Sequence, residues 1–238
     1  MDSVAAQSLW FAYPGRQILS DATLTVPSAQ VTGLLGSNGA GKTTFFDLIC
    51  GIRTAQAGQL QMSGQTCLYL SQVITASPVL QMEDAFRMMA ALTAYRNVDL
   101  EEVIEKLALW SSELVGRYTA LWHKKSAVCS YGEVRWFFST SLLAIGADLI
   151  LLDEPTAGVD PECRHYTWQC IKAAAREGTA VLVSSHNVQE IVEHTDAFHM
   201  LANQRFTRFS SGEEYMNYYR SQSLDEAFIQ AGKHVLAG

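Results

Sequence analysis

The sequence is poor in cysteine and has no long apolar run, and both shortages exclude classes of protein. Its 238 residues include five cysteines, scattered and without a C-x-x-C pair, which favours free thiols in a reducing compartment over disulfides or a zinc site. The longest apolar stretch, residues 142–152, is interrupted by Asp148 and falls short of the roughly 18 residues that a membrane span needs. The N-terminus has neither the basic start nor the apolar centre of a signal peptide, so none is expected.

Basic residues are also few. The net charge is -7, and the densest basic spot is only His123-Lys124-Lys125, which is more typical of a solvated face than of a nucleic-acid patch. No nucleic acid partner is therefore expected. In contrast, 48% of the residues are hydrophobic, so the chain can bury a sizeable core as one large or two small units.

What the sequence does contain is a G-x-x-x-x-G-K-T motif between an apolar run, residues 31–35, and a helical pattern, residues 43–50. This strand–loop–helix context is the one that a phosphate-binding loop requires. Glycines let the backbone N–H groups face a phosphate chain, and the following helix adds its positive end. Lys42 then reaches the outer phosphates and the Thr43 hydroxyl ligates Mg²⁺. The residues assigned to this loop are Gly36, Ser37, Asn38, Gly39, Ala40, Gly41, Lys42, Thr43 and Thr44.

A second motif places two carboxylates at the end of an apolar run. Residues 149–152 are all apolar, as in a buried parallel strand, and Asp153 and Glu154 follow directly. Ligands of parallel sheets bind at the carboxyl ends of the strands, where the phosphate loop also lies. We therefore expect Asp153 to hold Mg²⁺ through its water shell and Glu154 to act as general base on the attacking water.

Alternating strand and helix patterns predict an α/β fold, a mostly parallel sheet flanked by helices. Strands are predicted at 7–13, 22–26, 31–35, 59–62, 66–71, 149–152, 180–184, 197–201 and 205–210. Helices are predicted at 43–50, 82–95, 133–145, 161–177 and 187–195, after Asp99, and in the tail from 213 and again from Ser223. The region 81–125 is all-helical and is interpreted as a helical subdomain inserted between two α/β stretches. Its methionines Met82, Met88 and Met89 are core residues or an adaptable binding groove.

Taken together, these motifs resemble the nucleotide-binding domain of the ATP-binding cassette (ABC) superfamily over about residues 8–209. The resemblance implies a P-loop NTPase that binds ATP and Mg²⁺. It also assigns Tyr13 to adenine stacking, Gln72 to a Mg²⁺ and water contact that senses a membrane partner, and His186 to the γ-phosphate. Ala157-Gly158-Val159-Asp160 matches the D-loop. The catalytic residues implied are Glu154, His186 and Lys42; the metal ligands are Thr43, Gln72 and Asp153; Ser130, Gly132 and Asp160 complete the ATP-binding set.

One segment departs from the family pattern. The family signature is Leu-Ser-Gly-Gly-Gln, and here residues 129–133 read Cys-Ser-Tyr-Gly-Glu. Ser130 and Gly132 keep the hydroxyl and the N–H that grip a γ-phosphate across a dimer. Tyr131 replaces a glycine and adds bulk where the partner subunit's ATP must approach, so binding across the dimer is expected to survive in weakened form. Arg135 keeps a basic residue downstream.

The resemblance also implies an organisation for the chain. Residues 1–238 form a single ABC ATPase domain: about 1–80 and 126–210 make the ATP-binding core, 81–125 the helical subdomain and 211–238 a helical tail. The short stretch between Lys42 and Gln72 suggests a trimmed antiparallel β-subdomain.

Three functions fit this resemblance. The first is the ATPase subunit of a membrane transporter, held in the cytoplasm on the inner face of the membrane by a separate permease subunit and paired with a second ABC ATPase as a homodimer or heterodimer. Export is favoured because Ser223–Phe228 resembles a closing segment of bacterial exporter ATPases. The second is a soluble ABC ATPase in translation or DNA maintenance, and the third a regulatory cassette with low activity, supported only by Tyr131.

Overall fold

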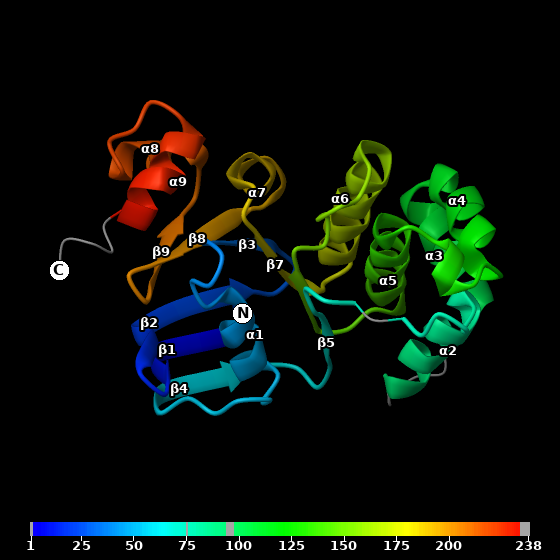
Figure 1. The fold of residues 1–238 in the computed structure, drawn as a ribbon, viewed down its shortest axis with the longest axis horizontal. Helices are drawn as coiled ribbons and strands as arrows, with labels where there is room; N and C mark the ends of the chain where they lie inside the picture. Colours follow the sequence, from blue (N-terminus) through cyan, green and yellow to red (C-terminus); the bar gives the residue numbers. More distant parts are fainter. Residues whose placement is uncertain (1, 75, 94–97, 234–238) are drawn as a thin grey trace.

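The computed structural model describes residues 2–74, 76–93 and 98–233. A six-stranded sheet in the order β5-β6-β7-β3-β8-β9 forms its centre (Figure 1). The first five of these strands are parallel and β9 returns antiparallel to β8, so the predicted mostly parallel sheet is confirmed. The strands are β3 (Val31–Leu35), β5 (Cys67–Leu70), β6 (Leu149–Asp153), β7 (Ala180–Ser185), β8 (Ala197–Ala202) and β9 (Arg205–Phe209).

A second, three-stranded antiparallel sheet has the order β2-β1-β4, with β1 at Asp2–Tyr13, β2 at Arg16–Pro27 and β4 at Ala57–Met62. Strand β1 begins five residues before the predicted start at Gln7. Its first half is rich in alanine and serine, which have little strand propensity, and is strand because Val4, Ala5 and Ala6 pair with β2 on one side and β4 on the other.

Helix α1 (Lys42–Ile49) packs between the two sheets, where Phe45 and Phe46 are fully buried. Strand β6 is buried on both faces: Leu149 and Leu151 contact the core around α1, while Ile150 and Leu152 contact the core under the helices of the opposite face. This double burial explains why its sequence is a continuous apolar run instead of an alternating one.

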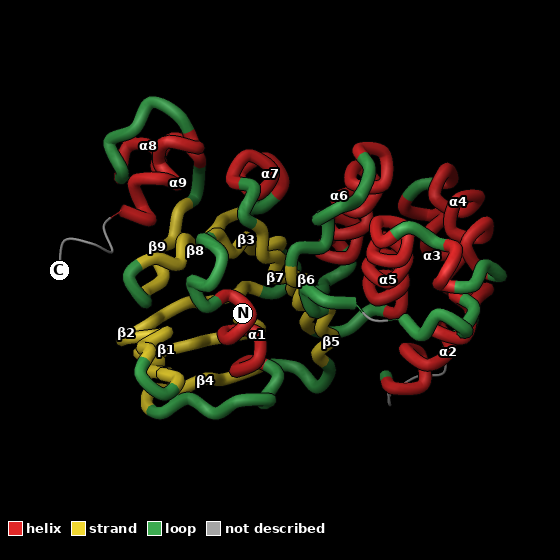
Figure 2. The backbone as a smooth tube through the Cα atoms, viewed as in Figure 1, coloured by secondary structure: helices red, strands yellow, loops and turns green. Residues whose placement is uncertain are grey.

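The opposite face of the sheet is covered by α5 (Tyr131–Ile145), α6 (Pro161–Arg176) and α7 (Val188–His194). Beyond α5 lie α2 (Met82–Leu92), α3 (Leu100–Trp110) and α4 (Ser112–Trp122), and helices α2 to α6 gather at one end of the molecule (Figure 2). Asp99 caps α3 as predicted, because its carboxylate accepts a hydrogen bond from the Glu102 N–H at 3.0 Å. The predicted end of α2 at Tyr95 lies outside the described residues.

The helices α2 to α5 share an aromatic core in which the rings of Tyr118 and Phe137 stack with 4.7 Å between their centroids. Of the three methionines, Met82 is fully buried in this core and Met89 packs at its edge, whereas Met88 is 57% exposed. The methionines are thus mainly core residues.

The tail contains α8 (Gly212–Tyr218) and α9 (Leu224–Lys233), which lie beside β9 (Figure 1). Ser223 accepts a hydrogen bond from the Glu226 N–H at 3.1 Å, as the predicted cap requires. Buried Tyr215 anchors α8, since its ring meets Phe198 and Phe209 edge to face. Within the described residues, every helix is too short or too polar to cross a bilayer.

His199, in the middle of β8, is a buried histidine with an unusual environment. It is 4% exposed, its Nδ1 has no hydrogen-bond partner, and Arg208 lies opposite it on β9. Burial, aided by the Arg208 charge, lowers the pKa of His199 from 6.5 to about 4. The folded chain therefore holds this imidazole neutral under conditions in which the unfolded chain protonates it.

We expect His199 to make the fold acid-labile. Since its folded pKa lies below the unfolded value, stability is complete above pH 6.5 and falls as the pH drops toward 4. Between pH 7 and pH 5 the loss is on the order of 2 kcal/mol, or about 4–8 °C in Tm for a chain of this size. Thermal unfolding of His199→Leu at both pH values should show a drop smaller by that amount. His123→Gln, at a mostly exposed histidine, should leave the drop unchanged; an equal drop in His199→Leu would contradict the assignment.

Candidate active site

The loop between β3 and α1 has the backbone that its glycines predict. Gly41 adopts φ 116°, and a β-carbon there would lie 2.5 Å from the Cγ2 of Ile18. Only glycine fits both the left-handed backbone and this close approach. The helix then begins at Lys42, so its positive end faces the loop.

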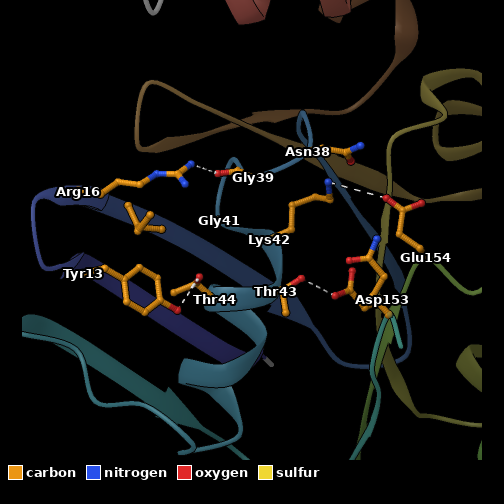
Figure 3. A pocket seen from close by; sticks show the side chains of 12 residues that line it. Tyr13, Arg16, Asn38, Gly39, Gly41, Lys42, Thr43, Thr44, Asp153 and Glu154 are labelled. Atoms are coloured by element: carbon orange, nitrogen blue, oxygen red, sulfur yellow. Dashed lines mark hydrogen bonds and ion pairs between the residues drawn. The ribbon is translucent and has the colours of Figure 1, made fainter. Parts of the chain in front are cut away.

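Lys42 folds back over the loop that precedes it. Its Nζ donates a hydrogen bond to the Gly36 carbonyl at 2.7 Å and lies 3.8 Å from the Glu154 Oε1 (Figure 3). Burial lowers the pKa of Lys42, while the charges of Glu154 and Asp153 raise it in part. The ammonium is thus a buried cation next to the carboxylates that the sequence singled out.

Asp153 ends β6 with its carboxylate turned toward the loop. One oxygen accepts a hydrogen bond from the Thr43 hydroxyl at 2.7 Å, and the other accepts one from the Ser184 hydroxyl. The carboxylate is almost fully buried. Two segments that are 110 residues apart, the phosphate loop and the end of β6, therefore meet through the pair predicted to bind Mg²⁺.

Glu154 lies directly beyond the strand in a strained conformation. Its φ is 55°, a left-handed value that disfavours residues with a β-carbon. Its N–H donates to the Ser184 carbonyl at 3.1 Å, and its Oε2 is 2.8 Å from the Nδ1 of His186. Its Oε1 is buried and has no hydrogen-bond partner, with Lys42 as the nearest cation. The carboxylate thus stands between Lys42 and His186.

Tyr13, at the end of β1, lies on the other side of the loop. Its hydroxyl is 3.3 Å from the Thr44 hydroxyl (Figure 3), and the Arg53 guanidinium stands 4.8 Å from its ring centroid. Arg16 donates to the Gly39 carbonyl at 2.6 Å. Sequence reasoning missed both arginines: Arg16 follows Tyr13 closely enough to have been considered, but no sequence pattern marks Arg53.

A pocket of about 180 Å³ joins most of the predicted site. Its lining comprises Tyr13, Arg16, Ile18, Asn38, Gly39, Gly41, Lys42, Thr43, Thr44, Gln72, Asp153 and Glu154. Ser37 and Ala40 line a neighbouring hollow. Ser130, Gly132 and Asp160 do not line this pocket, so the structure does not bring them together with Lys42.

The signature segment, residues 129–133, which departs from the family pattern, leads into the start of α5. Ser130 caps the helix: its hydroxyl accepts from the Glu133 N–H at 3.1 Å, and the Glu133 carboxylate accepts from the Ser130 N–H at 2.7 Å. Glu133 thus closes a capping box, which the S-x-x-E spacing could have revealed and which moves the helix start to Tyr131, two residues before the prediction. Gly132 packs so closely that a β-carbon would lie 2.4 Å from the Gly158 carbonyl.

The oxygen donors at the site fit Mg²⁺ only in part. Thr43, Asp153 and Gln72 offer hydroxyl, carboxylate and amide oxygens at the pocket. Across residues 2–74, 76–93 and 98–233, no three His, Cys, Asp or Glu side chains converge as a metal site. Such a sparse set suits an ion that brings phosphate oxygens and water as its remaining ligands.

Comparison with known proteins decides the family. The family model described as ABC transporter matches residues 19–157, more than half of the chain. The chain belongs to this family. It is an ABC ATPase, the type of ATP-binding subunit found in transporters.

Several curated relatives are similar to this ABC ATPase over most of its length. Protein McbF of Escherichia coli is 30% identical over 88% of this chain and 86% of its own. The lipopolysaccharide export system ATP-binding protein LptB of Haemophilus influenzae is 29% identical over 91% and 94%. The cobalt import ATP-binding protein CbiO of Salmonella typhimurium is 27% identical over 89% and 82%.

A solved structure of an ATP-binding subunit of an ABC transporter superposes with a TM-score of 0.80 at 22% identity, covering 96% of this chain and 98% of that one. This likeness supports the fold of a P-loop ATPase with its helical and antiparallel parts.

Proposed function

We propose that this ABC ATPase powers a membrane transporter by closing with a second cassette on two Mg·ATP molecules and hydrolysing them. The observation that carries this proposal is the position of the Glu154 carboxylate between Lys42 and His186. These are the two groups assigned to the γ-phosphate. A general base for water must stand beside the phosphate that the water attacks.

The contacts suggest an order of events in the site. An arriving γ-phosphate competes with the Glu154 carboxylate for Lys42 and His186 and frees that carboxylate to accept a proton from water. Thr43, Asp153 and Gln72 would hold Mg²⁺, which neutralises charge on the phosphates when bound. Tyr13 would stack on the adenine, with Arg53 on its ring as a second support.

A second cassette is required because the signature does not reach the pocket. Ser130 and Gly132 stand at the start of α5, outside the lining that holds Lys42. In the proposed dimer, each signature completes the partner's site. The partner is a second copy of this chain or a different ABC ATPase.

A membrane partner would dock beside Gln72. Val73, Val79 and Val128 are 74%, 73% and 72% exposed. Ser126 joins the segment that carries Val128 to the segment that carries Val79, since its N–H donates to the Leu80 carbonyl and its hydroxyl to the Ser77 carbonyl. Such exposed apolar side chains suit a coupling segment of a permease, which would keep this subunit on the cytoplasmic face of the membrane.

The direction of transport stays a proposal. The names of the relatives include an export system and an import protein. We retain export on the likeness of Ser223–Phe228, which forms the start of α9.

The proposal is tested by affinity capture of the tagged chain from detergent-solubilised membranes of its own cell, followed by mass spectrometry. A polytopic membrane protein should be retained, and a second cassette in the sample would identify a heterodimer. Val73→Asp should reduce this capture. Because Val73 is 74% exposed, the substitution should leave the buried core of the chain intact. Capture of ribosomal or DNA-bound proteins only would replace transport by the soluble role in translation or DNA maintenance.

A further inference from the structure

Arg135, on α5 one turn after Tyr131, is a fully buried cation with no carboxylate partner among the described residues. Its Nε donates to the Glu154 carbonyl and its Nη2 to the Asp153 carbonyl, both at 2.8 Å. Nη1 and Nη2 also donate to the Gln72 carbonyl at 3.0 and 3.1 Å. The guanidinium fork therefore fastens the ends of β6 and β5 to α5 through their backbones.

Tyr131 extends this set of contacts to the surface. Its hydroxyl donates to the same Gln72 carbonyl at 3.1 Å and accepts from the Arg135 Nη1 at 3.1 Å. Tyr131 is 51% exposed, and its ring abuts Gly158, where an added β-carbon would lie 3.3 Å from the Tyr131 Cδ1. The residue that replaces a signature glycine thus connects Gln72, Arg135 and the D-loop.

The backbone that Arg135 holds is the one that aims the proposed base. Glu154 has a positive φ, so its conformation persists only while its surroundings impose it. Arg135 on its carbonyl and Ser184 on its N–H fix the peptides on both sides. Neither Arg135 nor Tyr131 makes a hydrogen bond to the Glu154 or Asp153 carboxylate, so their hydrogen bonds act on these residues through the backbone.

We propose that Arg135 and Tyr131 form a positioning pair that aims Glu154 and Gln72 and ties both to the signature presented to the second cassette. The inference rests on the proposed function. In this proposal the Tyr131 hydroxyl stabilises the site of its own subunit. The bulk of the Tyr131 side chain, taken alone, predicts instead that it obstructs the partner's ATP. The two views give opposite results when the side chain is removed.

The deciding variant is Tyr131→Phe, which keeps the ring and removes only the hydroxyl. We expect kcat for ATP hydrolysis to fall about three- to tenfold, the net effect of one ordinary hydrogen bond, with KM unchanged because the phosphate loop and Tyr13 are untouched. Tyr131→Gly should lower kcat at least as much. Tyr166→Phe is the matched control: it removes a phenol bond from α6 to Glu113, outside the site, and should leave kcat unchanged.

Arg135→Lys tests the fork itself. It keeps the charge, but one ammonium cannot serve three carbonyls and a phenol, so kcat should fall more than tenfold. Full activity in Tyr131→Phe, or a rise in Tyr131→Gly, overturns the positioning pair while leaving the ATPase proposal standing. Absence of turnover in the parent protein overturns both.

Discussion

Replacement of Glu154 by Gln should lower ATP turnover by a factor of at least about 100, the usual contribution of a general base, while ATP binding and dimer closure persist. The amide keeps the size of the side chain, which matters because Glu154 is buried and its backbone is strained. It can still contact His186, yet it cannot accept a proton from water. Phosphate release measures turnover, and a fluorescent nucleotide measures binding.

Glu105→Gln serves as the matched control, because Glu105 is exposed on α3 and far in sequence from the site. Its turnover should equal that of the parent protein. The lifetime of the ATP-dependent dimer, measured by light scattering, should become longer in Glu154→Gln, since the closed state no longer decays by hydrolysis. If Glu154→Gln hydrolyses ATP at the parental rate, Glu154 is not the base, and a parent protein without turnover favours the regulatory cassette.

The catalytic and phosphate-binding residues could be predicted from the sequence because each group of them lies within a few consecutive positions. The loop from Gly36 to Thr43 follows a strand, so its glycines and Lys42 take fixed places once the strand and helix form. Asp153 and Glu154 follow a four-residue apolar run, and a parallel sheet brings such ends to one edge. Local pattern and sheet topology together determine this part of the site.

The contacts that sequence reasoning missed join distant segments. Arg135 reaches the Gln72 carbonyl across 63 residues, and the Arg53 guanidinium, which follows the C-terminal end of α1, lies over the Tyr13 ring. A lone arginine in a helix as fully buried as α5 gives no indication of its partners, because backbone carbonyls leave no mark in a sequence. The bulk of Tyr131 was visible, but its hydroxyl contacts depend on how α5 packs against the end of β5.

Lys42→Ala should weaken ATP binding about 10- to 100-fold, because a buried charge-assisted hydrogen bond to phosphate contributes about 1.5–3 kcal/mol. The Lys42 side chain is only 7% exposed and its ammonium donates to the loop, so solvent cannot replace it. A titration with a fluorescent nucleotide gives the Kd, and Lys172→Ala, at a lysine that contacts His194 on α7, is the control that should bind like the parent.

The Lys42→Ala variant separates the role of Lys42 in ATP binding from its role in catalysis. Without Lys42, the Oε1 of Glu154 has no cation within 4 Å among the described residues, and His186 stays as the partner of this carboxylate through Oε2. Turnover should therefore stay low even at ATP concentrations that restore occupancy, whereas recovery of the parental kcat would limit Lys42 to binding. An unchanged Kd would instead show that the loop's backbone N–H groups hold the phosphates unaided.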